Sequence, residues 1–508
     1  MSDNFNKKRI AKNSALLYIR MLFTVWLNLW ATRLVLNNLG VENMGVYNVV
    51  GSVLYICIGF TNGLTTAVIR FLTYEMGKKY GNINRVFCSS VNVIVISCVA
   101  FFIILETIGI IVLNNFLNIP DNIRDTAFWI YQLSAFTFIS SMLTIPYNAL
   151  IIAHEKINVF AIISIIQVVL SCIVAYSLAF FSNGRLMMYG ILSATTSLII
   201  QLMYQTYCRI KLPESKYSLI FDWQQMRQII KFTSISTTSG ILYMINNQSI
   251  TLVINWTFSV ALNAVYVIAL QLKNMILSFA LNILKAISPQ ITKTYADGEY
   301  ETHRKLVYTG SKAEVYMILI LLIPFMFRTD IIARLWLGNV PEYAVAFMRC
   351  TIFLSLTYAA FEPIRTAVLA TNNIARFLLI PDILNLLVIP VAYIVARWSK
   401  SPDLMILVIV IFEIFTCALR IWFGTRVGEI GIRDILKNVI YPTATVAILS
   451  SIVCYGLSVI TDKSLIGLII LVCANTLIMS VIIYKLGINR QERDTIKKFI
   501  SNKVRCKR

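Results

Sequence analysis

The sequence has 508 residues, of which 58% are hydrophobic and only 14% charged, and its mean hydropathy is +0.74. Soluble globular chains carry about 25% charged residues, so this composition excludes a fold surrounded by water. The net charge of +21 would suggest nucleic-acid binding in a soluble protein. Here the basic residues flank apolar blocks, and we expect no nucleic-acid partner.

The apolar residues form blocks of about 20 or more residues, the length an α-helix needs to cross a bilayer. A transmembrane β-barrel would show alternating segments of about 10 residues instead. The sequence therefore predicts an all-α integral membrane protein with fourteen transmembrane helices. The predicted spans are 12–37, 44–68, 87–113, 126–152, 157–182, 186–208, 232–256, 259–284, 310–336, 343–370, 374–396, 402–424, 438–460 and 464–485.

The distribution of Lys and Arg predicts the orientation. With the N-terminus inside, most of the 45 basic residues lie in connections and tails on the inner side. Basic residues next to a span resist translocation, so we expect a multi-pass inner-membrane protein with both termini cytoplasmic. The basic tail, 490–508, is expected to rest on anionic membrane lipids.

The chain repeats itself weakly after about 217 residues, which is six helices. The matching pairs include Pro146 and Pro363, Ala153 and Ala370, Ile157 and Ile374, and Phe160 and Phe377. An even number of helices gives parallel repeats, with a substrate path between the two halves. We predict two six-helix repeats plus two C-terminal helices. The expected parts are an N-lobe at 1–208, a cytoplasmic amphipathic linker at 209–231, a C-lobe at 232–425, and helices 13 and 14 with the basic tail at 426–508.

Within the linker, apolar residues recur at helical spacing beside charged ones. Leu219, Trp223, Met226 and Ile230 carry this pattern. It predicts an amphipathic helix that lies in the cytoplasmic interface.

Polar residues gather on single faces of particular predicted helices. On the second span, Asn48, Ser52, Tyr55 and Asn62 share one face with further small and hydroxyl residues, and Thr24 and Asn28 follow Arg20 on the first. The seventh span, the repeat partner of the first, carries Asn247. Such stripes either line a wet cavity or mediate close helix packing. We favour the cavity for the second span and leave both readings open for the seventh and eighth.

Ionisable residues within spans are costly, about 2.5–3.5 kcal/mol at the centre on insertion scales, so each is a functional candidate. The cationic candidates are Arg20, Lys273 and Arg365. Arg365 follows Glu362 by one helical turn. An ion pair between these two residues is therefore an equal alternative to a role of Arg365 in substrate binding. Arg33 lies near the outer end of its span, where snorkelling to headgroups explains it.

The isolated acids Glu106 and Glu413 have no evident partner in the sequence. Either suits protonation or binding of a coupling ion, and whether a proton or sodium ion drives transport is left open. Glu362 is a third acid whose functional role the sequence does not decide.

A cavity with Arg20 and Lys273 suits an anionic substrate, because cations bind phosphate oxygens. The Asn, Tyr and Ser side chains suit sugar hydroxyls. The candidate substrate-binding set is Arg20, Thr24, Asn28, Asn48, Ser52, Tyr55, Asn62, Asn247, Lys273 and Arg365. The residues thus favour a phosphate-linked, sugar-bearing lipid.

We expect no enzyme, cofactor or metal. The ten cysteines show no metal-ligand spacing, and both histidines, His154 and His303, lie in predicted connections. A polytopic membrane enzyme of glycan assembly, the weaker alternative, usually needs a large external loop or an intramembrane histidine.

The segments Thr32–Gly40 and Gly45–Gly51, with Arg70-Phe71-Leu72 and Ala153-His154-Glu155-Lys156, resemble bacterial polysaccharide flippases of the O-antigen type. These belong to the multidrug/oligosaccharidyl-lipid/polysaccharide (MOP) exporter superfamily, whose MATE-like fold has two lobes. The resemblance covers most of the first five helices.

The resemblance implies that undecaprenyl-diphosphate-linked oligosaccharide is flipped by alternating access for surface polysaccharide or lipopolysaccharide biosynthesis. It implies that cations on the first and eighth helices hold the diphosphate, which we map to Arg20 and Lys273. Other polysaccharide-assembly proteins are expected partners. A multidrug/cation antiporter of the same fold remains the alternative, although the first two spans contain no acid.

Overall fold

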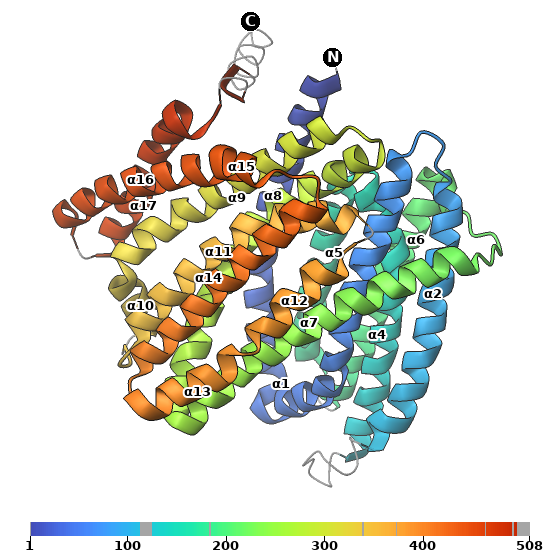
Figure 1. The fold of residues 1–508 in the computed structure, drawn as a ribbon. Helices are drawn as coiled ribbons and strands as arrows, with labels where there is room; N and C mark the ends of the chain where they lie inside the picture. Colours follow the sequence, from blue (N-terminus) through green and yellow to red (C-terminus); the bar gives the residue numbers. More distant parts are fainter. Residues whose placement is uncertain are drawn as a thin grey trace, which may run out of the picture. The chain divides into compact units, whose positions relative to one another are not determined.

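A computed structural model of the chain describes residues 2–111, 124–181, 184–337, 340–371, 373–462, 464–489 and 492–494. Within these ranges, all regular secondary structure is helical (Figure 1). Eleven helical segments of the described residues are long and apolar enough to cross a membrane. The chain is therefore an all-α, multi-pass membrane protein, as predicted, and the count of fourteen spans stays a prediction.

The N-terminal elements are α1 (Ser2–Gly77), α2 (Ile83–Ile104), η1 (Leu105–Gly109), α4 (Arg124–Ala153), α5 (Ile157–Ser177), η3 (Leu178–Phe180), α6 (Arg185–Lys211) and η4 (Pro213–Ser215). The elements that follow are α7 (Trp223–Thr257), α8 (Val260–Ala296), α9 (Tyr300–Phe327), α10 (Thr329–Leu337), α11 (Ala344–Ala370), α12 (Ala375–Asn385), α13 (Val388–Ser399), α14 (Pro402–Val427), α15 (Ile432–Ile435), η5 (Leu436–Ile440), α16 (Tyr441–Ile460), α17 (Leu465–Ile482) and η6 (Ile483–Gly487).

The first two predicted spans both fall within α1. The helix is interrupted at Gly40, whose backbone has φ +77° and ψ 166°. Glycine adopts this conformation readily because it has no Cβ atom. The seventh predicted span falls within α7; neither α1 nor α7 is among the eleven candidate spans.

Of the four residues that predicted an amphipathic helix, Trp223, Met226 and Ile230 lie in the first turns of α7, whereas Leu219 precedes it in a non-helical segment. After α6 the chain makes the short turn η4 and then runs without helix until Trp223. Side chains of α2 hold this segment: Asn84 Nδ2 donates to the carbonyls of Glu214 and Lys216, at 2.8 and 2.7 Å, and Asn92 Nδ2 donates to the Ile220 carbonyl at 2.9 Å. These tertiary bonds satisfy backbone groups that a helix would otherwise have paired.

The chain divides into two compact units, Ala15–Gly240 and Ile241–Arg508 with Met1–Ser14. The division falls inside α7. Within the first unit, α4 packs against α2 and α6, and α6 packs against α5. Within the second, α11 packs against α9 and α14, and α14 packs against α13. The same order of neighbours therefore occurs in each unit.

The residues that suggested a repeat occupy equivalent places in these helices. Pro146 lies inside α4 and Pro363 inside α11, and the two helices end at Ala153 and Ala370. Both alanines are completely buried.

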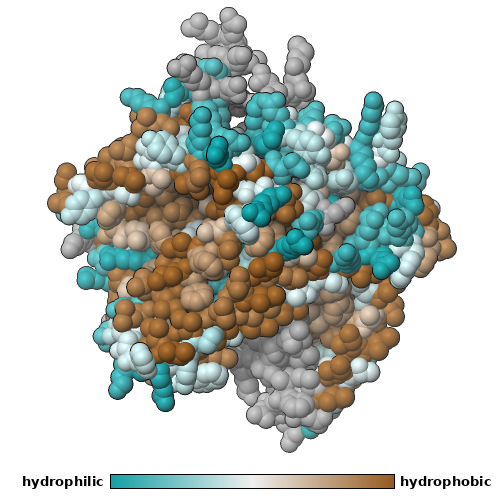
Figure 2. Space-filling model, viewed as in Figure 1, coloured by the Kyte–Doolittle hydropathy of each residue, from teal (hydrophilic) through white to brown (hydrophobic). Residues whose placement is uncertain are grey.

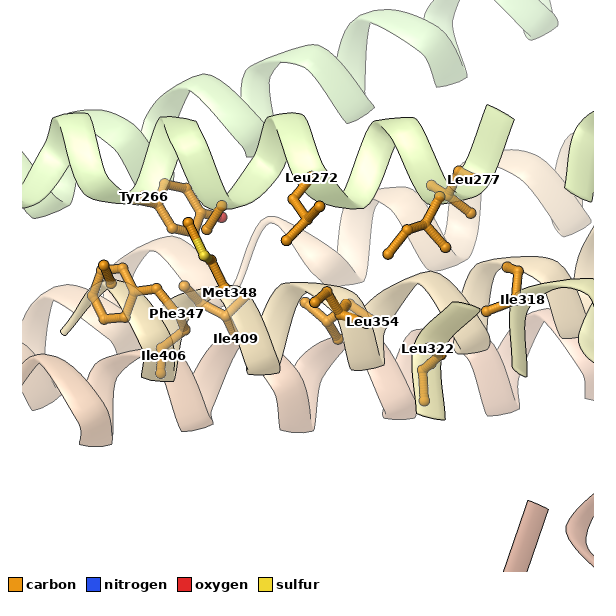
Figure 3. Close-up of a cluster of buried hydrophobic side chains, with 14 of the residues drawn as sticks. Tyr266, Leu272, Leu277, Ile318, Leu322, Phe347, Met348, Leu354, Ile406 and Ile409 are labelled. Carbon is orange, nitrogen blue, oxygen red and sulfur yellow. The ribbon is translucent and has the colours of Figure 1, made fainter. Parts of the chain in front are cut away.

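The core of the second unit is formed by large apolar side chains between α8, α9, α11 and α14 (Figure 3). Tyr266 and Phe347 meet edge to face, with their ring centroids 6.1 Å apart. Apolar surface covers much of the region over α12, α13 and α14 (Figure 2). Exposed apolar side chains of these helices include Ile383, Ile394 and Ile411. An apolar exterior of this extent suits contact with lipid.

Candidate functional site

Arg20, in α1, is bound within the first unit by α5. Its Nη1 donates to Ser164 Oγ at 3.3 Å, and its guanidinium lies 5.0 Å from the centroid of the Phe160 ring. Tyr204 of α6 interacts electrostatically with Arg20. The Nε atom of Arg20 is buried without a hydrogen-bond partner. Arg20 is therefore turned toward protein, with a cation–π contact and without an ion pair to any described carboxylate.

The other predicted residues of the first unit have more local contacts. Thr24 Oγ1 donates to the Met21 carbonyl of its own helix at 3.0 Å. Asn28 and Asn62 are exposed in α1. The side chains of Asn48, Ser52 and Tyr55 lie outside the described part of the structure. Among the candidate binding residues of the second span, Asn62 is thus the one whose side chain is described.

Lys273, in the middle of α8, belongs to the second unit. It is 6% exposed and lies beside the buried core residues Leu272 and Ile276. No acidic side chain of the described residues forms an ion pair with it. Burying an ammonium group without a partner is unfavourable, so Lys273 marks a place where a negative charge would be stabilised.

Asn247 of α7 bonds back to its own helix. Its Nδ2 donates to the Tyr243 carbonyl at 2.8 Å. This contact needs no ligand and agrees with the packing interpretation.

Arg365 pairs with Glu362, as one of the two sequence readings expected. Arg365 Nη1 lies 3.3 Å from Glu362 Oε2, and the exposed fractions of the two side chains are 35% and 4%. The Arg365 side chain is thus partly accessible, whereas the Glu362 side chain is buried.

Glu362 and Arg365 adjoin a polar network that crosses α7, α11, α12 and α14, called here the C-terminal polar network. Arg420 Nη2 donates to Asp382 Oδ1 at 2.5 Å, and the Arg420 guanidinium lies 4.7 Å from the Phe361 ring centroid. Asp382 also acts electrostatically on Arg365. The two Arg–carboxylate pairs therefore interact with each other.

The network continues to Asn385, at the end of α12. Its Nδ2 donates to Glu413 Oε1 at 3.3 Å, and its Oδ1 accepts from Thr416 Oγ1 at 3.2 Å. Its backbone carbonyl accepts from Asn246 Nδ2 at 2.9 Å. Asn385 is thus contacted by side chains from both α7 and α14.

The break between α12 and α13 makes the Asn385 carbonyl available. The Ile389 amide donates to the Leu386 carbonyl rather than to Asn385, and Pro390 follows without an amide hydrogen. Broken helices in membrane proteins are tolerated where neighbouring groups satisfy the freed backbone atoms. Asn246 does so here.

The acids that appeared isolated in the sequence have tertiary partners. Glu106 Oε2 accepts from Gln132 Nε2 at 3.2 Å, while Glu106 Oε1 is buried without a partner. Glu413 is bound by Asn385. Sequence order could not reveal these partners because they lie on other helices.

His303 is not in a connection. The turn between α8 and α9 spans only residues 297–299, and His303 lies inside α9, completely buried, with its Nδ1 2.9 Å from the Ile291 carbonyl. The prediction that His303 lies in a connection was wrong because α8 and α9 both extend beyond the apolar blocks that marked their spans. His154 does lie in a turn, between α4 and α5.

Several charged residues of the spans were missed, namely Glu314, Asp382 and Arg420. The available signal was the one used for Arg20, an ionisable side chain inside an apolar block. Asn246 and Asn385 carry no comparable signal, because buried asparagines are indistinguishable from packing residues in the sequence.

An open cavity of about 410 Å³ lies apart from these residues in the second unit. Its lining includes Phe258, Leu262, Val265, Glu342, Tyr343 and Lys400. The negative charge of Glu342 raises the pKa of the Tyr343 phenol. None of the predicted substrate-binding residues lines it.

The fold places the chain among membrane proteins similar to MATE structures. A mutant MATE protein aligns with TM-score 0.72 and 14% identity, covering 83% of this chain and 96% of that one. A MOP superfamily transporter from Pyrococcus furiosus aligns with TM-score 0.69 and 14% identity over 83% and 95%. A MATE transporter from Vibrio cholerae gives 0.64 and 14% over 82% and 97%.

At the level of sequence, a family model described as polysaccharide biosynthesis protein matches residues 13–339. The match covers more than half of the chain, and the chain belongs to this family. No curated protein matches it. Family and fold together confirm the resemblance stated from the sequence motifs.

Proposed function

We propose that the chain is a transporter that flips undecaprenyl-diphosphate-linked oligosaccharide across the bacterial inner membrane by alternating access. Membership of the polysaccharide biosynthesis family and the fold shared with MOP transporters support this proposal. Its expected form is fourteen spans in two parallel six-helix repeats, with both termini cytoplasmic. O-antigen, a lipopolysaccharide component, is the glycan class that the motifs favour.

The observation that carries the substrate class is Lys273. A buried lysine without an acidic partner in the described residues attracts an anion, and a lipid diphosphate supplies one at membrane depth. Arg20, bound only to a hydroxyl and an aromatic ring in the contacts described above, remains able to bind phosphate oxygens in the same way.

The test is complementation of a strain that lacks the protein. We expect Lys273→Met to abolish surface glycan and to accumulate lipid-linked oligosaccharide on the cytoplasmic face, with the protein still present in the membrane. Lys305→Met is the matched control, because Lys305 is exposed on α9 and pairs with the exposed Glu301. Normal glycan export by Lys273→Met would overturn its role.

Drug transport is the competing outcome. One of the similar solved structures is described as a multidrug resistance MATE family transporter. Loss of drug efflux in the deletion strain, with normal surface glycan, would favour the antiporter. Efflux that depends on Glu106 would strengthen that result.

A further inference from the structure

Glu314, in the middle of α9, is completely buried in the second unit. Neither of its carboxylate oxygens has a hydrogen-bond partner. An ionised carboxylate in such surroundings would bear the full cost of desolvation, and such groups normally stay neutral. The buried and unpartnered state of Glu314 therefore points to a bound proton.

Glu362 of α11 is the charged group that acts on Glu314. The two helices touch at this level, since a Cβ added to Gly310, one turn before Glu314, would lie 3.7 Å from Pro363. Glu362 is 3% exposed, and its Oε1 also lacks a partner, whereas its Oε2 holds Arg365. Two neighbouring buried carboxyls cannot both ionise cheaply. The carboxyl without a cationic partner, Glu314, is therefore the one expected to hold a proton.

Among the described cations, Arg365 pairs with Glu362 and none pairs with Glu314. On α11, Tyr358 and Arg365 face Glu362; Tyr243 of α7 acts on Tyr358, and Asp382 of α12 acts on Arg365. Arg420 of α14 forms an ion pair with Asp382 and also interacts electrostatically with Glu413. Lys312, on α9 itself, pairs with Glu492.

The remaining elements packed against α9 add few charges. α16 and α17 contain no charged residue, η5 contains Lys437, and α10 contains Asp330 and Arg334. α8 carries Lys273, Lys285 and Lys293 along its length. Within the carboxyl pair and the C-terminal polar network, four acids (Glu314, Glu362, Asp382 and Glu413) lie with two arginines, Arg365 and Arg420. A proton on the carboxyl pair reduces this excess of negative charge.

We propose that Glu314 and Glu362 form a proton-binding pair, and that the proton state of this pair controls whether Arg365 is free to bind a phosphate. With one proton on Glu314, Glu362 is ionised and holds Arg365. A second proton, taken from water, neutralises Glu362 and weakens its hold on the guanidinium, which then binds a phosphate oxygen; loss of that proton reverses the exchange. The second half of the proposal rests on the proposed function.

The protonated carboxyl is tested first, without any substrate. Infrared spectra of the protein in nanodiscs at neutral pH should show the C=O stretching band of a protonated carboxylic acid. Glu314→Gln should lose this band, and so should Glu314→Met, a second variant of similar volume. Glu301→Gln should keep it, because Glu301 lies on the same helix but is exposed. Retention of the whole band in both Glu314 variants would overturn the proton site.

The control of Arg365 is tested by binding of undecaprenyl diphosphate to the same nanodiscs at several pH values. We expect tighter binding as the pH falls, because protonation releases Arg365. Glu362→Gln should bind about tenfold more tightly than wild type at neutral pH, within the usual range of coupling between sites, and should lose the pH dependence. Arg365→Met should lose both the affinity and the pH dependence.

The two arms separate the possible failures. Equal binding by wild type and Glu362→Gln at every pH would overturn the control of Arg365. Absence of binding under all conditions would overturn the proposed function, while the infrared band would still establish the proton on Glu314. Absence of the band, with normal binding, would overturn the proton site and leave the proposed function standing.

Discussion

Single charged side chains in this protein differ mainly in whether a partner reaches them. Arg365 and Arg420 are each held by a carboxylate, Lys273 is buried without one in the described residues, and Glu314 lacks even a hydrogen bond. Because charge inside a membrane protein is expensive, unpartnered groups indicate a ligand or a proton. This difference, rather than the mere presence of charge, selects the candidate residues.

Lys312 provides a prediction on stability at this scale. Its Nζ lies 2.6 Å from Glu492 Oε2, and the two side chains are 3% and 23% exposed. Glu492→Ala leaves a buried lysine unpaired. We expect a loss of about 3 kcal/mol, the lower end of the range for breaking a buried pair because Glu492 is partly exposed.

The measurement is thermal unfolding in detergent. Adding Lys312→Met to Glu492→Ala should recover part of the loss, because the unpaired charge is then removed. Glu301→Ala is the control, since its pair with Lys305 is exposed and worth less than about 1 kcal/mol. Equal effects of the two alanine variants would contradict the argument.

At the scale of elements, close helix contacts depend on glycine. Gly63 of α1 faces α7 within the first unit. A Cβ at this position would overlap the Thr237 hydroxyl and lie 3.2 Å from the Thr237 amide nitrogen. Small residues allow such approach between helices in membranes, where packing drives association.

Gly63→Val should therefore destabilise the protein by about 1–3 kcal/mol, the usual cost of overpacking. Unfolding in detergent measures it. Gly456→Ala in α16 is the matched control, because nothing lies within 4 Å of the added Cβ. Combining Gly63→Ala with Thr237→Ala should restore the stability lost by Gly63→Ala alone. If stability is not restored, the overlap with the Thr237 hydroxyl is not the cause of the loss.

Over the whole molecule, the proposed topology makes a prediction about sidedness. Alkaline phosphatase fused after Lys400, in the predicted external connection between the eleventh and twelfth spans, should be active. Green fluorescent protein fused after Lys211 or at the C-terminus should fluoresce, because both sites are expected in the cytoplasm.

The three fusions together test whether the number of spans before each site is even or odd. Absence of fluorescence from the C-terminal fusion, with the protein expressed, would contradict the predicted cytoplasmic C-terminus. Immunoblots of the fusions control for expression.

The sequence alone determined the fold class, most span positions and the family, because long apolar blocks and basic flanks act locally and leave a direct trace in residue order. It also singled out Arg20, Lys273 and Arg365. The tertiary structure decided which charges are paired, that side chains of α2 hold the segment between η4 and α7, and that Glu314 is buried beside Glu362. Those outcomes depend on side chains from helices distant in sequence, and no local pattern of residues records which helices will meet.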